Sequence, residues 1–224
     1  MRTDERIALL DQMRRVKEQG EKEVQAPEEK TLTLEDALAA LSEGKLELED
    51  GRLLEFEICP YFKEEFPFIC FKGFYQASQE DESGRILVNH TEGVSQIINW
   101  TPQKRAAKTL EQWSNLLVNG MAANRLSAQI LKKKSLETVE YFCFEVPAGE
   151  KRVWNILFRF KTQWMEFTGN YNCLKEDVGT YGVLLEAMVV KLDEWMRKRE
   201  GACADGRSYQ GCLLYTSPSP RDRG

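Results

Sequence analysis

Residues 137–171 read ETVEYFCFEVPAGEKRVWNILFRFKTQWMEFTGNY, and this stretch decides the fold. Apolar and polar residues alternate over 137–146, 152–160 and 163–171, which is the period of half-buried strands. Turn-forming residues at 147–150 and 161–162 separate them. The stretch therefore predicts a three-strand antiparallel meander. We expect one face of it to collect Phe142, Phe144, Trp154, Ile156, Phe158, Met165 and Phe167.

Helical patterns lie on both sides of the meander. After it, apolar residues recur at helical spacing from Tyr181 to Trp195, and Asp177 or Thr180 is the expected cap. Before it, Thr109 and Gln112 form a capping-box pattern at the start of a helix that ends near residue 124. A shorter helix is expected from residue 33 to the glycine at 44.

A hairpin is predicted over residues 45–58, with Asp50-Gly51 as a type I′ turn. Its leucines and aromatic residues alternate with acidic ones. One face takes Leu46, Leu48, Leu54, Phe56 and Ile58. The other face takes four glutamates, which we call the acidic strip: Glu47, Glu49, Glu55 and Glu57.

Further strands are expected at 66–71, 85–90 and 94–100. Strands and helices do not alternate one for one, so the order favours an α+β fold: an antiparallel β-sheet of about six to eight strands packed by two or three helices. We expect a single α+β domain over residues 33–198. An N-terminal helix or arm at 1–20 and a linker at 21–32 would precede it, and a flexible tail at 199–211 would follow.

The final segment has a different origin. Residues 212–222 read CLLYTSPSPRD, which is similar to the translation of a transposon-type sequencing adapter. We expect 212–224 to be an adapter-derived artefact and exclude it from fold reasoning. Leaving it out changes the net charge from −5 to −6 and leaves five cysteines, namely Cys59, Cys70, Cys143, Cys173 and Cys203.

The order of elements resembles the PsbP-like superfamily, including its LpqN and DcrB type bacterial domains. Residues 153–171 (VWNILFRFKTQWMEFTGNY), leading into the helix at 180–195, carry the resemblance, and 109–124 would be the other helix. The likeness covers roughly residues 45–198. It implies a curved antiparallel sheet between helices, used mostly to bind or assemble with other proteins and without catalysis. No functional residue is carried over.

The composition limits the kinds of molecule that we expect the protein to bind. The chain has 224 residues, 42% of them hydrophobic and 30% charged, as in a soluble globular protein. Its acidity disfavours nucleic acid, and no apolar run is long enough for a membrane span. No signal core follows the charged start, so we expect a cytoplasmic protein with reduced thiols.

Catalytic patterns are weak. His90 is the single histidine, and a Cys–His pair would need it near Cys59, Cys70, Cys143 or Cys173, which spacing does not show. The cysteines lack the C-x-x-C spacing of a zinc site, and no phosphate-loop or G-x-G-x-x-G string occurs. We therefore predict no cofactor, no metal and no catalytic residues. An enzyme with a cryptic cysteine or carboxylate site stays an alternative.

The predicted function is a non-enzymatic, bacterial-type protein-binding module. Its candidate partner-binding residues are the acidic strip, as a docking surface for a basic partner, with Tyr61 and Phe62 from an aromatic turn. The alternative interpretations, which the sequence favours, are a solvated outer face for the strip and a plug for the core for the aromatic residues. A basic patch of Lys104, Arg105, Lys108 and 132–134 is expected to be solvated. A chaperone for a secreted protein is a further alternative.

Overall fold

The structure is a computed structural model that describes residues 32–61, 66–102, 108–161 and 165–204. Apart from Leu32, these residues belong to one compact unit that begins at Thr33. Over them the chain forms three α-helices and ten strands in two antiparallel sheets, which confirms the α+β fold. The predicted arm at 1–20, most of the linker, Phe62, Lys104, Arg105 and the segment 212–224 lie outside the described residues.

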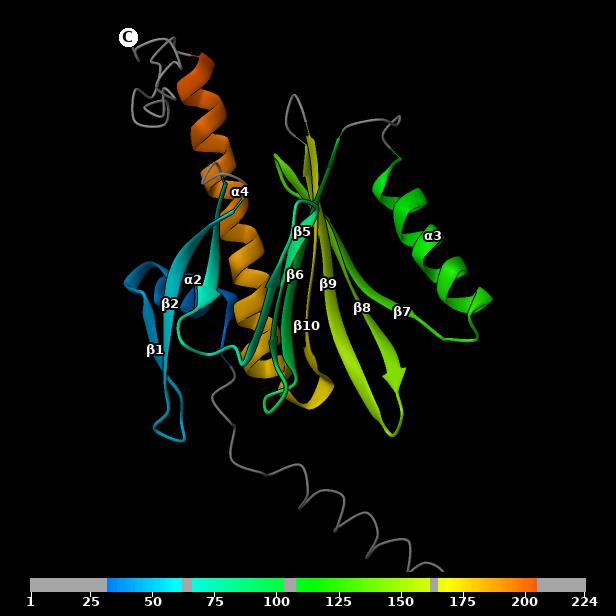
Figure 1. The fold of residues 1–224 in the computed structure, drawn as a ribbon, viewed down its shortest axis with the longest axis horizontal. Coiled ribbons are helices and arrows are strands. Elements are labelled where there is room, and N and C mark those ends of the chain that lie inside the picture. The colour runs from blue at the N-terminus through cyan, green and yellow to red at the C-terminus, as the bar shows by residue number, and fades with distance from the viewer. Residues whose placement is uncertain (1–31, 62–65, 103–107, 162–164, 205–224) are drawn as a thin grey trace, which may run out of the picture. The chain divides into compact units, whose positions relative to one another are not determined.

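The chain divides its strands between a small and a large sheet (Figure 1). The small sheet has the order β1 (Lys45–Glu47), β2 (Leu53–Tyr61), β3 (Phe66–Phe71). The large sheet has the order β4 (Ala77–Glu80), β5 (Gly84–Asn89), β6 (Val94–Pro102), β10 (Met165–Leu174), β9 (Lys151–Lys161), β8 (Val139–Ala148), β7 (Gln129–Ser135).

The predicted meander is confirmed as β8, β9 and β10, but two strands escaped prediction. Both lie at the edges of the large sheet, where only one neighbour holds each strand. The sequences ASQE in β4 and QILKKKS in β7 are polar, and no residue in either strand is buried. Edge strands need little apolar surface, so hydrophobic periodicity does not reveal them.

Helices cover both faces of the large sheet. On one face, helix α4 (Val183–Ala204) lies against β8, where the Asp193 carboxylate accepts a 3.0 Å hydrogen bond from the Val139 N–H. On the other face, helix α3 (Leu110–Ala123) places Trp113 4.9 Å from Phe142, ring centroid to centroid. We call these the α4 face and the α3 face.

The expected grouping of apolar residues on one face of the meander is wrong. Phe142 lies opposite Leu157 and Phe144 opposite Asn155, whereas Ile156 lies opposite Cys143. The phenylalanines of β8 therefore point to the α3 face, and Trp154, Ile156 and Phe158 point to the α4 face. Because β8 buries side chains on both of its faces, apolar alternation does not define the register, and a one-residue shift exchanges the faces.

Local signals predicted the ends of α2 and α3 but not those of α4. Helix α2 (Leu34–Glu43) begins with a capping box between Thr33 and Asp36 and ends at Gly44, where φ is 80°. Helix α3 begins with the expected Thr109–Gln112 capping box. The cap expected for α4 is absent, because a 3₁₀ turn and a π turn lead into the helix and Asp177 makes no side-chain cap. Helix α4 also continues beyond residue 198, into the expected tail.

The β1–β2 hairpin is confirmed, with a different turn from the one predicted. A 2.8 Å hydrogen bond from the Leu48 N–H to the Arg52 carbonyl closes a three-residue loop. Only Gly51 in that loop has positive φ, at 80°, so the turn is not type I′. It corresponds to a type I turn followed by a left-handed glycine, the next commonest hairpin connection.

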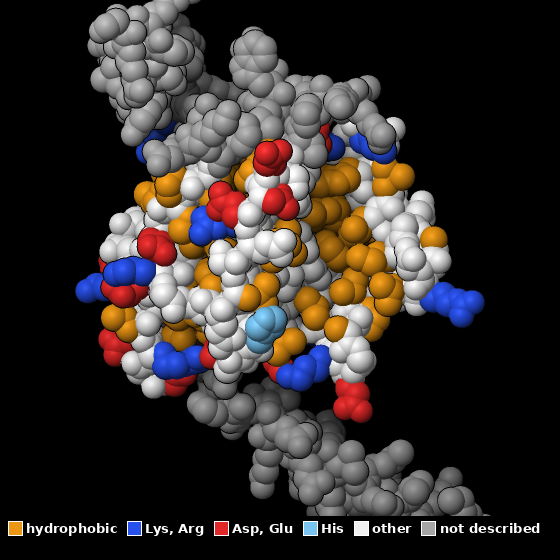
Figure 2. Space-filling view, viewed as in Figure 1, with side chains coloured by type: hydrophobic (Ala, Val, Ile, Leu, Met, Phe, Trp, Pro, Cys, Tyr) orange, Lys and Arg blue, Asp and Glu red, His pale blue; other side chains and the backbone are white. Residues whose placement is uncertain are grey.

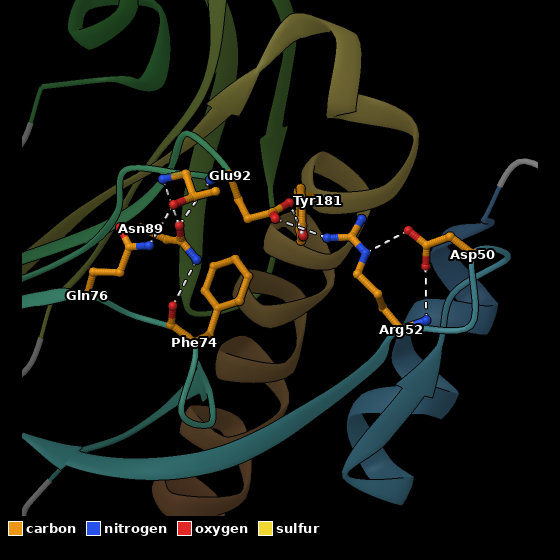
Figure 3. Close-up of polar contacts among 8 residues, drawn as sticks. Asp50, Arg52, Phe74, Gln76, Asn89, Glu92 and Tyr181 are labelled. Atoms are coloured by element: carbon orange, nitrogen blue, oxygen red, sulfur yellow. Dashed lines mark hydrogen bonds and ion pairs between the residues drawn. The ribbon is translucent and has the colours of Figure 1, made fainter.

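A polar network ties this hairpin to the rest of the domain (Figure 3). The Arg52 guanidinium is 2.6 Å from Asp50 and 3.0 Å from Glu92, which lies in the β5–β6 turn. The Tyr181 hydroxyl donates a 2.8 Å hydrogen bond to the same glutamate. The hydrogen bond from Tyr181 holds the pKa of Glu92 below its ordinary value, and the Arg52 guanidinium lowers it further. The network thus joins three segments that are distant in the sequence.

Candidate functional site

Three glutamates of the acidic strip lie in the small sheet, Glu49 lies in the loop between β1 and β2, and all four are exposed. They do not oppose one another, because Lys45 is paired with Glu55 and Glu47 with Leu53. Lys72 adds a second cation 3.5 Å from Glu55. The strip is therefore less concentrated in charge than the sequence suggested. Its role in binding a basic partner stays a prediction.

Tyr61, the other candidate that the structure describes, is 1% exposed and lies in the core. Its hydroxyl is 3.3 Å from the Cys70 sulfur, and the Arg85 guanidinium stacks 4.6 Å from its ring centroid. Strand β2 reaches Tyr61, so the residues expected in an aromatic turn partly continue a strand. In this position the Tyr61 ring offers no surface to a partner.

The lysine run at 132–134 lies in edge strand β7, where alternate side chains point to opposite faces. Lys132 pairs with Glu186 of α4, and Lys133 lies 2.5 Å from Glu111 of α3. The run therefore does not form one basic patch. Instead, its lysines connect the edge of the sheet to the helices on both faces.

The surface that the sequence did not single out is the α3 face. From β5 to β8 the strand registers place two rows of side chains across it. The first row is Val88, Ser95, Asn172, Asn155 and Phe144. The second row is Ile86, Ile97, Asn170, Leu157 and Phe142. Neither row contains a charged side chain.

Helix α3 covers only one side of this face. It lies mainly against β7 and β8, and Figure 1 shows it standing beyond that end of the sheet. Ser114 is its one buried residue, while Leu110, Trp113, Leu117 and Met121, its expected core face, are only half-buried. On the sheet, Ile86 is 38% exposed. Figure 2 shows the result, a hollowed surface of hydrophobic side chains between the sheet and α3.

The uncovered part of the sheet is wide enough for a helix. Neighbouring strands lie about 4.8 Å apart, so the four strands β5, β6, β10 and β9 span roughly 15–20 Å. A helix with its side chains is about 10 Å wide. We call this space the α3 groove. Its floor is the two rows of side chains, and its wall is the half-buried face of α3.

The described residues offer little for metal binding or catalysis. No group of three or more His, Cys, Asp or Glu among them is placed to hold a metal ion. His90 is exposed in the β5–β6 turn, whereas Cys70, Cys143 and Cys173 are buried in strands. Burial raises the pKa of the Cys143 and Cys173 thiols to about 12. Cys59 is half-buried, and a hydrogen bond from Cys70 lowers its pKa.

Thiol reactivity should follow this pattern. We expect iodoacetamide at neutral pH to modify Cys59 at least about 100-fold faster than Cys143 or Cys173, because only the thiolate reacts and Cys59, unlike those two, is accessible and lowered in pKa. Peptide mapping by mass spectrometry after timed alkylation measures the rates. The Cys59→Ser variant is the control for assignment. Equal rates at Cys59 and Cys143 would contradict the prediction.

Sequence reasoning missed the groove because its residues are spread over five strands. One signal was available. Asparagine is depleted in strands, yet β10 carries Asn170 and Asn172 on one face, and Asn155 faces the same way in β9. Polar side chains in the middle of an otherwise apolar sheet mark a position where something other than core packing is selected.

The fold and the groove define an α+β domain in which one sheet face is covered by a helix and the other is left partly open. No protein-family model matches the chain, and no curated protein matches it by sequence. Among solved structures it is similar to the solution structure of cyanobacterial PsbP from Synechocystis sp. PCC 6803. The TM-score is 0.47 at 9% identity, and the match covers 59% of this chain and 88% of that one. No residue role is taken from that likeness.

None of the helices that the structure describes is long and apolar enough to cross a bilayer.

Proposed function

We propose that the protein is a non-enzymatic binding module that holds an α-helix of another protein in the α3 groove. The observation that carries the proposal is the half-buried apolar face of α3 opposite two uncharged rows of the sheet face. The next row of that face holds the Arg159–Glu140 ion pair, which bounds the uncharged part. An exposed apolar surface of this kind, outside the core, is typical of an interaction site. An uncharged floor favours an uncharged, apolar segment, because burying an unpaired charge is strongly unfavourable.

A helix suits the groove better than an extended peptide. The backbone groups of β6, β10 and β9 are already paired with neighbouring strands on both sides. A segment that lies on the face of the sheet therefore finds no free backbone partners in the floor. An α-helix satisfies its own backbone hydrogen bonds, whereas an extended chain would bury unpaired N–H and C=O groups.

The remaining parts of the proposal come from the sequence. The partner is a protein and not nucleic acid, since the chain is acidic at −5, and not a membrane, since no apolar run is long enough for a span. We place its action in the cytoplasm. The LpqN and DcrB type of PsbP-like domain, used mostly to bind other proteins, is in keeping with such a role. A chaperone that covers an apolar helix of a secreted protein would be one form of it.

The groove can be tested with stapled helical peptides of Leu and Ala that carry Lys at both ends and match the 14-residue length of α3. We expect Ile86→Glu, which places a charge in the floor, to weaken binding at least about tenfold. Fluorescence anisotropy of labelled peptide measures the dissociation constant.

Ile58→Glu is the matched control, since Ile58 is also an exposed strand isoleucine, at 59%, but belongs to the small sheet. It should leave peptide binding unchanged. If both substitutions weaken binding equally, or if neither does, the groove is not the binding site.

A further inference from the structure

Two cysteines lie on one face of the small sheet. Cys59 of β2 is paired with Phe68 of β3, two residues before Cys70, so the two cysteines are diagonal neighbours across the strands. The Cys70 thiol donates a hydrogen bond to the Cys59 sulfur, which brings the two sulfur atoms into contact. Cys59 is half-buried, whereas Cys70 is only 2% exposed. One accessible sulfur therefore lies against one buried sulfur.

Two polar groups lie beside the pair. The Tyr61 hydroxyl is 3.3 Å from the Cys70 sulfur, and the Arg85 guanidinium lies 4.6 Å from the centroid of the Tyr61 ring. The positive charge of Arg85 favours the thiolate form of either cysteine. The hydrogen bond from Cys70 lowers the pKa of Cys59 in spite of burial and of the nearby Glu57 carboxylate. Cys59 is therefore the more acidic thiol of the pair.

We propose that Cys59 and Cys70 are a redox modification site, which hydrogen peroxide or an organic hydroperoxide oxidises to a reversible disulfide. First, the Cys59 thiolate attacks one peroxide oxygen: an S–O bond forms, the O–O bond breaks, and hydroxide or alkoxide leaves with the two electrons that sulfur has lost. Second, the Cys70 sulfur attacks the Cys59 sulfur. An S–S bond forms, the S–O bond breaks, and the hydroxyl leaves with the Cys70 proton as water. The site lies in the small sheet and is separate from the α3 groove.

The surroundings explain why the two cysteines react in this order. Only a thiolate attacks peroxide readily, and Cys59 is the accessible and more acidic thiol. The hydrogen bond to Cys59, together with burial, raises the pKa of Cys70, so Cys70 keeps its proton while Cys59 is a thiolate. Oxidation removes the negative charge from Cys59, and the Tyr61 hydroxyl and the Arg85 cation still favour a Cys70 thiolate. Cys70 thus becomes a nucleophile once Cys59 has been oxidised.

The resulting disulfide is expected to be easily reduced. The Cα atoms of diagonal neighbours are about 7–8 Å apart, slightly beyond the usual span of a disulfide. Closing the bond must therefore draw the two strands together near Cys59, where β2 ends two residues later. A strained disulfide is more readily reduced, so a dithiol reductant, itself oxidised to a disulfide, returns both thiols. The pair therefore suits a reversible response to peroxide better than a permanent cross-link.

Peptide mapping of the full-length protein tests the proposal. The reduced protein is treated with hydrogen peroxide, quenched with iodoacetamide and digested with trypsin, which places the two cysteines in separate peptides, 53–63 and 64–72. We expect mass spectrometry to find these two peptides joined, and to find them joined at least about tenfold faster than Cys143 or Cys173 is oxidised. Dithiothreitol should separate them again.

Three variants assign the two steps. Cys70→Ser should stop at the sulfenic acid of Cys59, which dimedone traps and mass spectrometry detects. Cys59→Ser should leave Cys70 unmodified, because the buried thiol is not reached by peroxide directly. Cys173→Ser is the matched control, since Cys173 is also a buried strand cysteine but belongs to the large sheet. It should form the disulfide at the wild-type rate.

Several results would overturn the proposal. They are unlinked peptides after peroxide treatment, oxidation of Cys59 without a link to Cys70, and a link from Cys59 to a cysteine outside the pair. Equal rates of oxidation at Cys59 and Cys143 would also reject it. The wild-type map needs no variant, so a folding defect in Cys70→Ser leaves the test decisive.

Discussion

Replacing Gly169 with alanine is expected to lower the free energy of unfolding by about 3 kcal/mol, the upper part of the usual range for overpacking a core. Gly169 lies in β10 directly opposite Phe158 of β9. A Cβ atom at residue 169 would stand 2.0 Å from the Phe158 Cζ and 2.3 Å from its Cε1. The Phe158 ring is fully buried and packs 4.9 Å from the Tyr171 ring, so it has nowhere to move.

Urea unfolding followed by circular dichroism measures this loss. The matched control is Gly120→Ala in α3, where nothing lies within 4 Å of the added Cβ. That substitution should stabilise the protein by about 0.5–1 kcal/mol, because alanine favours helix over glycine. Combining Gly169→Ala with Phe158→Leu should be less destabilising than the sum of the two single changes, since the smaller side chain makes room. Strict additivity would show that Phe158 is not the obstacle.

Replacing Asp193 with alanine is the second large effect, and we expect a loss of about 3 kcal/mol. Asp193 is 5% exposed and reaches from α4 to the start of β8. Its Oδ1 accepts hydrogen bonds from the Thr138 N–H at 2.7 Å, the Thr138 hydroxyl at 2.9 Å and the Val139 N–H at 3.0 Å. Alanine would leave the backbone N–H groups of Thr138 and Val139 without this acceptor. A buried donor that has no partner lowers the free energy of unfolding.

Thermal unfolding measured by calorimetry or circular dichroism tests this prediction. Glu194→Ala is the control, because Glu194 is the next residue of the same helix but forms only a partly exposed ion pair with Lys191. Its effect should stay within about 0.5 kcal/mol. Asp193→Asn should fall between the two, since an amide oxygen can still accept hydrogen bonds while the pairing with Arg197 is lost. A loss no larger than that of Glu194→Ala would contradict the role given to Asp193.

Much of the fold was predictable from local patterns. The sequence indicated the central strands of the large sheet, the Thr109–Gln112 capping box, the start of α2 and the α4 helix, because a few neighbouring residues carry each signal. Its failures have a common cause. Strands β4 and β7 lie at edges and bury none of their own residues. Their place in the sheet depends on one neighbour each, and no pattern within four or seven polar residues records that pairing.

The candidate site was harder to predict than the fold. The acidic strip could be predicted because charged residues are read directly from the sequence. The structure confirms only that its glutamates are exposed. Tyr61 was singled out as a loop aromatic, yet it ends a strand and is buried. The α3 groove has no continuous sequence signature, since its floor takes alternate residues from five strands.

The sequence by itself therefore determined where α2 and α3 begin and end and which apolar segments are strands. Hydrogen bonds between residues three or four apart, such as Thr109 with Gln112, decide these features locally. Only the tertiary structure decided which side of each strand faces which helix. The sequence of a strand that is buried on both faces does not define its register. Pairing with strands distant in the sequence defines it, as Asn170 does with Leu157 and Ile97, each more than ten residues away. That pairing, together with an α3 that covers only part of its face, brings two uncharged rows of side chains to the floor of an apolar groove.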